Sequence, residues 1–345
     1  MKREFNIRGR LVGENVYPFV IAEAGINHEG DINKALQLVD AAVRAGADCM
    51  KFQCHITEAE MIKTDIKPAK ISDEKLWDII KRCELTYKEE VRLKKYCESK
   101  GIIFLSTPFS REAADRLQKM NVDAYKIGSG ECNNIPLVEH IAKKKKPIIL
   151  STGMNDIKSI GKTVNIIREY GVPLILMHCT SMYPTPHHNV RLGAIKQLRE
   201  VFKLPVGLSD HSYGIYTCMG AVALGACVLE KHFTLSKKWP GPDISISVTP
   251  SQLRELVKGA KAIFEAGGGK KVILEDEKPV IDFAYACVVA IRNIKAKERF
   301  SLDNIWVKRP GTGEIKAELF NSILGKKSKV DIEKDKQIQW EHIYG

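Results

Sequence analysis

Short apolar runs recur along the chain up to about residue 230, and each is followed by a longer segment with a different pattern. Those segments, for example 32–45, 88–100, 111–120 and 157–170, place apolar residues on one helical face and charged residues on the other. Glycine or proline often precedes the next run. The runs themselves are Phe19–Ala22, Cys49–Phe52, Ile102–Leu105, Ala124–Ile127, Ile148–Leu150, Leu174–Met177, Pro205–Leu208 and Cys227–Leu229.

Eight strand-then-helix units with continuously apolar strands predict an α/β fold, a (β/α)8 TIM barrel. A doubly wound open sheet is the alternative. It would not need eight strands, and no GxGxxG turn follows the first run. The barrel is expected to cover residues 1–269.

The pattern changes after the glycines at 267–269. Residues 270–281 are expected to form a linker, and residues 282–345 a small, mostly β domain. Strand-like pieces lie at 286–291 and 304–308, and turn residues lie at 311–313. About 60 residues is marginal for independent stability, so we expect this domain to pack on a barrel, its own or a partner's.

Polar side chains follow all eight apolar runs. In a (β/α)8 barrel the active site forms where the strands end, and buried polar groups cost free energy unless they are paired. A full set of eight polar strand ends is therefore hard to explain by packing. The residues concerned are Glu23, Lys51, Gln53, Ser106, Thr107, Lys126, Ser129, Glu131, Ser151, Thr152, His178, Thr180, Ser181, Ser209, Asp210, His211, Glu230 and His232.

Two histidines stand at the ends of neighbouring predicted strands. His211 and His232 are separated by one helix-length segment, and acidic residues lie close to each. Two imidazoles with nearby oxygen ligands favour Mn²⁺, Fe²⁺ or Zn²⁺ over Ca²⁺. A pair of core histidines is the alternative, and spacing alone leaves both open. His28 is expected either to be catalytic or to position the first loop.

A second group of strand ends favours binding of a tetrahedral anion. Hydroxyl and ammonium groups suit phosphate oxygens, whereas any one of the hydroxyls alone would be read as a helix N-cap. The set as a whole favours phosphate. Its members are Lys51, Thr107, Lys126, Ser129, Ser151 and Ser209.

Composition narrows the classes of partner. The net charge is +12, but lysine and arginine are spread along the chain and aromatic residues make up 7%, so we expect anionic small substrates rather than nucleic acid. Nine cysteines without a CxxC pair indicate reduced thiols. The N-terminus has no signal-peptide core, and the longest apolar stretch is about half of a membrane span. We expect a cytoplasmic protein with no membrane partner.

At these residues the chain resembles the sialic acid synthase family, the N-acetylneuraminate synthases that condense phosphoenolpyruvate with N-acetylmannosamine. The shared motifs run in order through nearly the whole chain, and the C-terminal part resembles the antifreeze-like (SAF) domain of the same family. The motifs are AEAGINHEG (22–30), KFQ (51–53), STPFS (106–110), YKIGSGECNN (125–134), LSTGMN (150–155), HCTSMYPTP (178–186), GLSDHS (207–212), EKHFT (230–234), GPD (241–243) and WVKRPGTG (306–313).

The resemblance implies roles for individual residues. His211 and His232 match the metal ligands, usually of Mn²⁺, with Mg²⁺ and Co²⁺ as alternatives, and Glu23 matches a residue beside the reacting carbons. Ser181 stands where many bacterial members have Asn, and its shorter reach puts that phosphate contact in doubt. The phosphoenolpyruvate site is matched by Lys51, Thr107, Lys126, Ser129, Ser151, Ser181 and Ser209, and the sugar site by Gln53, Tyr183, Asp243, Phe283 and Arg309.

The resemblance also implies an assembly and a reaction. Arg309 and Phe283 match residues that the small domain delivers into the partner's barrel, which implies a domain-swapped homodimer. The implied reaction releases phosphate by C–O cleavage. Alternatives are a legionaminic or pseudaminic acid synthase acting on a diacetamido sugar, an N-acylneuraminate-9-phosphate synthase, a metal-dependent aldolase using free pyruvate, and a non-enzymatic ice- or carbohydrate-binding protein.

Overall fold

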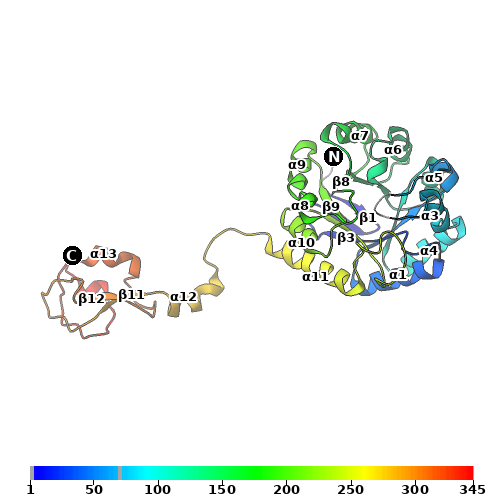
Figure 1. Cartoon of the computed structure of the whole chain (residues 1–345). Helices are drawn as coiled ribbons and strands as arrows, with labels where there is room; N and C mark the ends of the chain where they lie inside the picture. Colours follow the sequence, from blue (N-terminus) through cyan, green and yellow to red (C-terminus); the bar gives the residue numbers. More distant parts are fainter. Residues whose placement is uncertain (1–3, 69–71, 345) are drawn as a thin grey trace. The chain divides into compact units, whose positions relative to one another are not determined.

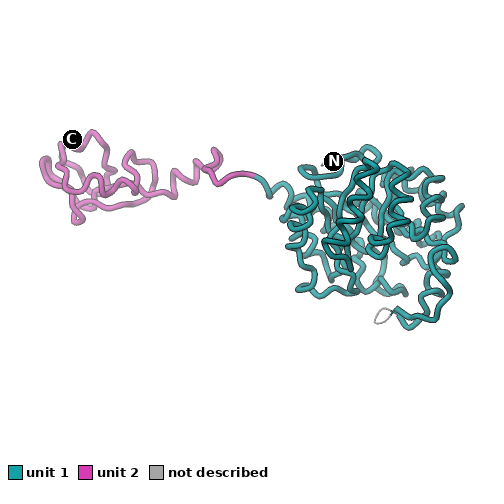
Figure 2. The backbone as a smooth tube through the Cα atoms, turned by 90° about the horizontal axis from the view of Figure 1, so that it is seen from above, with its two compact units in different colours: residues 1–268 teal, residues 269–345 magenta. Residues whose placement is uncertain are grey.

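The chain divides into two compact units, Met1–Gly268 and Gly269–Gly345 (Figure 2). The structure, a computed structural model, describes residues 4–68 and 72–344. The division falls next to the boundary expected after residue 269. The segment expected as a linker contains a 3-10 helix, η2 (Glu275–Glu277), and the start of α12 (Lys278–Ala284).

The first unit is built on eight parallel strands. Their order is β5-β4-β3-β10-β9-β8-β7-β6, and β5 contacts β6, so the sheet curls into a nearly closed barrel. Each predicted apolar run lies on one of these strands, apart from single residues at some ends, which confirms the barrel. The strands are β3 (Phe19–Gly25), β4 (Cys49–Cys54), β5 (Ile103–Pro108), β6 (Tyr125–Ile127), β7 (Ile148–Ser151), β8 (Leu174–Cys179), β9 (Val206–Asp210) and β10 (Val228–His232).

A ring of helices surrounds the strands (Figure 1). Helix ends follow local chemistry: Thr86 and Glu89 form a reciprocal capping box at the start of α4, and Gly46 ends α1 at a φ of 84°. The outer helices are α1 (Ile32–Ala45), α4 (Tyr87–Ser99), α5 (Arg111–Lys119), α6 (Ile135–Ala142), α7 (Ile157–Glu169), α9 (Gly193–Phe202), α10 (Tyr216–Ala223) and α11 (Pro250–Ala266).

Shorter helices lie in the loops that follow the strands. They are α2 (Thr57–Glu60), α3 (Leu76–Cys83), η1 (Ser129–Glu131) and α8 (His187–Val190).

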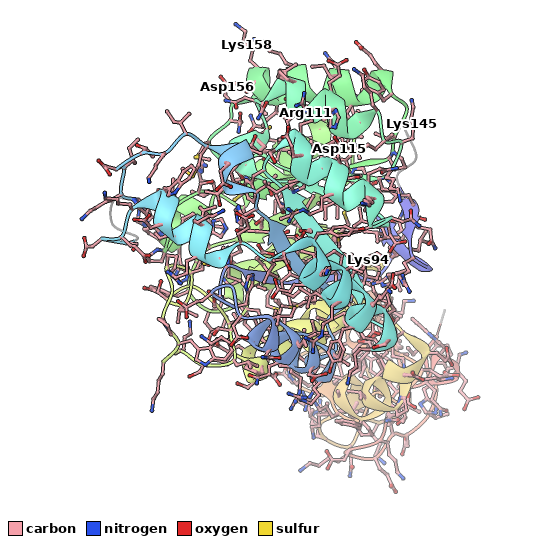
Figure 3. The ribbon with its side chains drawn as sticks, turned by 90° about the vertical axis from the view of Figure 1, so that its right-hand side faces the viewer. Lys94, Arg111, Asp115, Lys145, Asp156 and Lys158 are labelled. Atoms are coloured by element: carbon pink, nitrogen blue, oxygen red, sulfur yellow. The ribbon has the colours of Figure 1, made fainter. Side chains whose placement is uncertain are left out.

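Charged side chains extend from the outside of the ring into solvent, as Arg111, Asp115 and Lys158 do in Figure 3. None of the described helices is both long enough and apolar enough to span a membrane.

Two layers of apolar side chains hold the barrel together. One layer packs between strands and helices, and the other fills the barrel interior. The interior layer includes Phe5, Ile7 and Val12 of a hairpin that the sequence did not predict, made by β1 (Glu4–Ile7) and β2 (Arg10–Gly13). These side chains meet residues at the beginnings of the strands, so the hairpin closes that end of the barrel. All nine cysteines are buried free thiols, which confirms the expectation for them.

The second unit has a hydrophobic cluster of its own. Its antiparallel strands β11 (Cys287–Ala290) and β12 (Ile305–Lys308) match the two predicted strand pieces. Helical turns follow at η3 (Ala317–Leu319), α13 (Phe320–Ile323) and η4 (Trp340–His342). The cluster is formed by Val288, Ala290, Ile294, Phe300, Ile305, Ile315, Ile323, Ile332, Ile338 and Ile343.

Candidate active site

A cavity of about 590 Å³ opens where the barrel strands end. The residues predicted within the barrel for the metal, phosphoenolpyruvate and sugar sites all line it. Five other polar strand-end residues do not, namely Ser106, Thr152, His178, Thr180 and Asp210. Phe283 and Arg309 belong to the second unit, where Phe283 is 61% exposed and Arg309 lines a separate hollow. The predicted residues in the cavity are Glu23, Lys51, Gln53, Thr107, Lys126, Ser129, Ser151, Ser181, Tyr183, Ser209, His211, His232 and Asp243.

Two lysines and two glutamates meet at the bottom of the cavity, all nearly inaccessible to solvent. Lys51 Nζ lies 2.8 Å from Glu23 Oε2 and 3.6 Å from Glu230 Oε1. Lys126 Nζ lies 3.6 Å from Glu230 Oε2. Each ammonium therefore has a carboxylate partner, as buried charges require.

Burial and ion pairing shift the pKa values of these four groups in different directions. Burial raises the pKa of Glu23 to about 7, although Lys51 opposes the shift. The pKa of Glu230 is lowered, because Lys126 and Lys51 outweigh the effect of burial. Burial lowers the pKa of Lys126, whereas the two glutamates raise that of Lys51 against the effect of burial. The two carboxyls therefore differ in how readily each takes up a proton.

Hydroxyl groups extend the positive floor of the cavity. Lys126 Nζ donates to Ser151 Oγ at 2.6 Å, and Lys51 Nζ donates to Thr107 Oγ1 at 3.1 Å. A Cβ added at Gly153 would lie 2.4 Å from Ser181 Oγ and 2.8 Å from the Oγ of Ser129. The hydroxyls of Ser181 and Ser129 therefore lie close together beside Gly153.

The two predicted metal ligands face one another at the side of the cavity. The rings of His211 and His232 are 5.4 Å apart between centroids. His211 Nδ1 lies 3.1 Å from the carbonyl oxygen of Thr180, so Nδ1 carries a proton and Nε2 is the nitrogen left for a metal ion to bind. Burial, with the nearby cations, holds the pKa of His232 well below its usual value. The neutral form, which binds metals, is thereby favoured.

A divalent cation fits this pair of rings. His232 Nδ1 is buried without a hydrogen bond, and Asp243 Oδ2 lies 3.5 Å away. Within residues 4–68 and 72–344 no three His, Cys, Asp or Glu side chains converge as a complete metal cage. If the two imidazoles held a cation, its other coordination positions would have to be filled by substrate and water.

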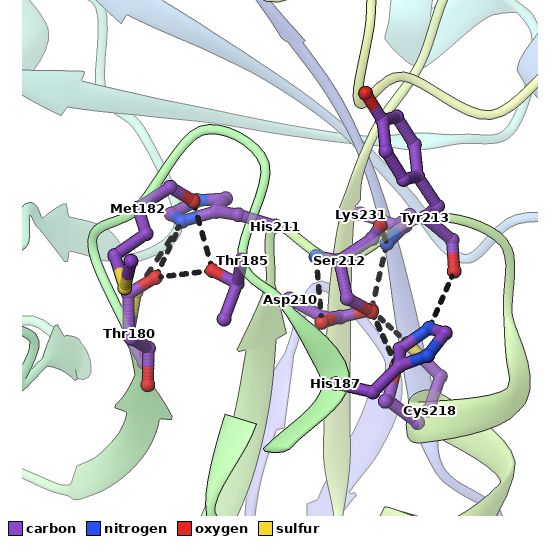
Figure 4. A network of polar contacts seen from close by, with 12 residues as sticks. Thr180, Met182, Thr185, His187, Asp210, His211, Ser212, Tyr213, Cys218 and Lys231 are labelled. Carbon is purple, nitrogen blue, oxygen red and sulfur yellow. Dashed lines mark hydrogen bonds and ion pairs between the residues drawn. The ribbon is translucent and has the colours of Figure 1, made fainter. Parts of the chain in front are cut away.

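A network of an ion pair and hydrogen bonds, here called the polar brace, holds the end of strand β9, which His211 follows. Lys231 Nζ on β10 lies 2.7 Å from Asp210 Oδ2 on β9, and both side chains are buried. Asp210 also accepts from the backbone and hydroxyl of Ser212 (Figure 4). A further hydrogen bond to Asp210 comes from Thr217 Oγ1. This network fixes the residues on both sides of His211.

The sequence did not point to two of the cavity residues, His55 and Glu60. The alternation of side chains along a strand could have indicated His55. Lys51, Gln53 and His55 follow one another at intervals of two residues, so they share one face of β4 and its extension. Of the two roles left open for His28, the structure favours the loop. Its Nδ1 accepts from the backbone N–H of Gly30, and it is not among the residues that line the cavity.

Comparisons with known proteins match both units. The model of the NeuB family matches residues 38–272, and that of the SAF domain matches residues 285–343. An uncharacterized protein of Methanocaldococcus jannaschii is 43% identical over 99% of both chains. N,N'-diacetyllegionaminic acid synthase of Campylobacter jejuni is 39% identical over 93% of this chain and 98% of its own. The crystal structure of N-acetylneuraminic acid synthetase from Leptospira borgpetersenii in complex with citrate matches with a TM-score of 0.73 and 34% identity, covering 81% of this chain and 95% of that one.

Proposed function

The chain belongs to the NeuB family, and we propose on that premise that it condenses phosphoenolpyruvate with N-acetylmannosamine to N-acetylneuraminate and phosphate. The observation that carries the proposal is the single cavity in which buried lysines, hydroxyls from several strands and a histidine pair converge. The nine free thiols suit a reducing compartment, so we propose the cytoplasm as the site of the reaction.

Phosphoenolpyruvate would bind at the floor of the cavity. Lys51 and Lys126 would contact its anionic groups, and the cradle of hydroxyls would fix its phosphate. The hydroxyls come from Thr107, Ser129, Ser151, Ser181 and Ser209, which lie on or directly after strands β5, β6, β7, β8 and β9. Holding the donor at fixed distance from the sugar removes much of the entropic barrier of a two-substrate reaction.

His211 and His232 would hold a divalent cation, for which we propose Mn²⁺. When bound, it would supply Lewis-acid activation of the aldehyde of the open-chain sugar. The free Nε2 of His211 and the unpartnered Nδ1 of His232 support this assignment.

Glu23 would move the proton in the condensation. The C3 carbon of phosphoenolpyruvate bonds to the sugar aldehyde carbon, water adds at C2, and the C2–O bond to phosphate breaks. Glu23 would accept a proton from that water and return it to the new alkoxide, and the leaving phosphate would take the proton of the C2 hydroxyl. The buried position of Glu23 and its pKa of about 7 suit a group that takes and returns a proton near neutral pH.

The charges of the cavity support an unphosphorylated sugar. Its described lysines, Lys51 and Lys126, are paired with Glu23 and Glu230, and Glu131 adds another carboxylate to the lining. Among the described lining residues no lysine or arginine remains to balance a sugar phosphate, which disfavours a 9-phosphate synthase. Gln53, Tyr183 and Asp243 would hold the sugar. We further propose that Phe283 and Arg309 complete this site from the partner chain of a domain-swapped homodimer.

The test is a substrate panel. The protein is incubated with phosphoenolpyruvate, Mn²⁺ and, in turn, N-acetylmannosamine, its 6-phosphate and diacetamido sugars, and phosphate and the nine-carbon acid are measured. We expect the highest kcat/KM with N-acetylmannosamine. A preference for a diacetamido sugar would instead indicate a legionaminic or pseudaminic acid synthase. Condensation of free pyruvate would contradict the proposed chemistry.

Metal dependence is tested separately. Exhaustive chelation should abolish condensation, and added Mn²⁺ should restore it because both histidines remain in place. Mn²⁺ should also raise the melting temperature of the chelated protein, and this gain should vanish in a His211→Ala, His232→Ala double variant. Full activity after chelation would refute the role of the cation.

A further inference from the structure

A chain of contacts leads from the mouth of the cavity to Glu23. His55 Nδ1 lies 3.0 Å from both carboxylate oxygens of Glu60, and His55 Nε2 lies 3.0 Å from Gln53 Oε1. Gln53 Nε2 then donates to Glu23 Oε1 at 3.2 Å. The His55 ring is 4% exposed and stacks on Phe109, with 4.6 Å between centroids and 10° between planes.

Both partners of the His55 ring are hydrogen-bond acceptors. A carboxylate has no N–H or O–H to offer, and the atom of Gln53 that faces the ring is its amide oxygen. In this arrangement Nδ1 faces the carboxylate of Glu60 and Nε2 faces the amide oxygen of Gln53, so the ring is held between two acceptors. Glu60 is itself 8% exposed at its side chain, so solvent screens the pair only weakly.

This pairing decides which end of the Gln53 amide faces the reacting groups. The two ends of an amide have nearly the same shape but opposite hydrogen-bonding roles. Because His55 holds the oxygen, the NH2 group faces Glu23. A flipped amide would bring its oxygen against a carboxylate oxygen and its NH2 against a ring N–H, and both contacts would be repulsive.

We propose that His55, held by Glu60 and Phe109, is a positioning residue that fixes the NH2 end of Gln53 toward Glu23 and the sugar. The inference rests on the proposed function, in which Gln53 binds the sugar. His55 acts through Gln53, so its loss changes how the sugar is held while the phosphate-binding hydroxyls stay in place.

Two near-isosteric variants separate the contacts of the ring. The amide nitrogen of Asn stands at about the place of Nδ1, and that of Gln at about the place of Nε2. His55→Gln therefore keeps a donor toward Gln53, and His55→Asn keeps one toward Glu60. We expect His55→Asn to raise the KM of the sugar about tenfold, the size of one lost hydrogen bond, with the KM of phosphoenolpyruvate unchanged. His55→Gln should restore most of that loss.

A Gln53→Ala background tests whether His55 acts through Gln53. In that background His55→Asn should have no further effect on the KM of the sugar, whereas a general structural role would add to the loss. His140→Gln is the matched control, because His140 also pairs with a carboxylate, that of Asp115 at 2.7 Å, away from the cavity. Its kinetic constants should equal those of the unmodified protein.

The outcomes separate the inference from the function on which it rests. If the unmodified protein releases no phosphate with any sugar, both fail together. If it is active but His55→Asn and His55→Gln behave alike, or raise both KM values equally, the positioning role is refuted and the function stands. If neither variant folds, Glu60→Gln takes their place, and an unchanged sugar KM there refutes the role.

Discussion

At the scale of single residues, the carboxyl group of Glu23 is held between opposing influences. Burial raises its pKa to about 7, Lys51 opposes that shift at 2.8 Å, and the Gln53 amide donates to its other oxygen.

Reasoning from the ends of the predicted strands was sufficient to place Glu23, Lys51 and the histidine pair together, since strand ends meet at one face of a barrel. It could not find the contact of His55 with Glu60, because that depends on how the chain turns after β4.

The pH dependence of the reaction should follow Glu23. A carboxylate accepts protons only when ionised, so kcat/KM should rise with pH and level off above about 7. Glu23→Gln should lower kcat about 10²- to 10⁴-fold, the usual worth of a general acid–base group, and should remove this limb of the profile. Steady-state phosphate release between pH 5 and 9 measures both. A Glu23→Gln variant with the same profile would exclude Glu23 as the group that titrates.

A substitution at Gly153 tests whether the neighbouring serine hydroxyls bind phosphate. Gly153→Ala puts a methyl group 2.4 Å from Ser181 Oγ and 2.8 Å from the Oγ of Ser129, so both hydroxyls must move. We expect the KM of phosphoenolpyruvate to rise about tenfold, as for one lost hydrogen bond, and more than that of the sugar. Gly193→Ala is the control, because a Cβ there meets nothing within 4 Å. An equal rise of both KM values would argue against a role of these serines in phosphate binding.

At the scale of elements, strands β9 and β10 place the two histidines. The hydrophobic pattern predicted both strands, because parallel strands buried on both faces are continuously apolar. The polar brace between them was not predictable, since Asp210 and Lys231 look like ordinary polar strand ends in the sequence. The short helices α2 and α3, which shape the mouth of the cavity, were not among the predicted helical segments either, because they contain too few turns to show a clear period.

Breaking this brace should destabilise the barrel. Lys231→Met leaves the Asp210 carboxylate buried without its cation, which costs about 3–5 kcal/mol of unfolding free energy. The exposed pair of Lys295 with Asp331, whose side chains are 80% and 59% exposed, is the comparison. Lys295→Met should change stability far less, because solvent screens an exposed ion pair. Denaturant unfolding of both variants measures the difference, and equal effects would contradict a structural role for the buried pair.

At the scale of the whole molecule, the two units have separate hydrophobic clusters and are joined through residues 269–284. The change of pattern near Gly267–Gly269 was sufficient to separate them in the sequence. Their arrangement was beyond sequence reasoning, because no residue pattern within one chain states which barrel a domain contacts. The family resemblance supplied the expectation of an exchanged domain, which experiment can test.

Mixing two inactive variants tests that exchange. If each site combines a barrel from one chain with Arg309 from the other, Glu23→Gln and Arg309→Ala chains that form mixed dimers regain one intact site. After random exchange of equal amounts of the two chains, about half of the dimers are mixed, and each mixed dimer has one intact site of two. We therefore expect about a quarter of full activity. The mixture is measured after dissociation and reassembly, with each variant alone as control. Activity no greater than that of the separate variants would exclude a shared site.

The glutamates beside Lys51 and Lys126 have a consequence for turnover. If Lys51 and Lys126 had no carboxylate partners, the site would bind the phosphate product tightly. Release of phosphate would then leave two buried ammonium groups without a counter-ion, which is costly in a medium of low dielectric constant. Here Glu23 and Glu230 can take up each lysine as the anion leaves. In the proposed reaction the carboxylates would thus act as internal counter-ions that compete with the product. They would weaken anion affinity and thereby ease the departure that ends each catalytic cycle.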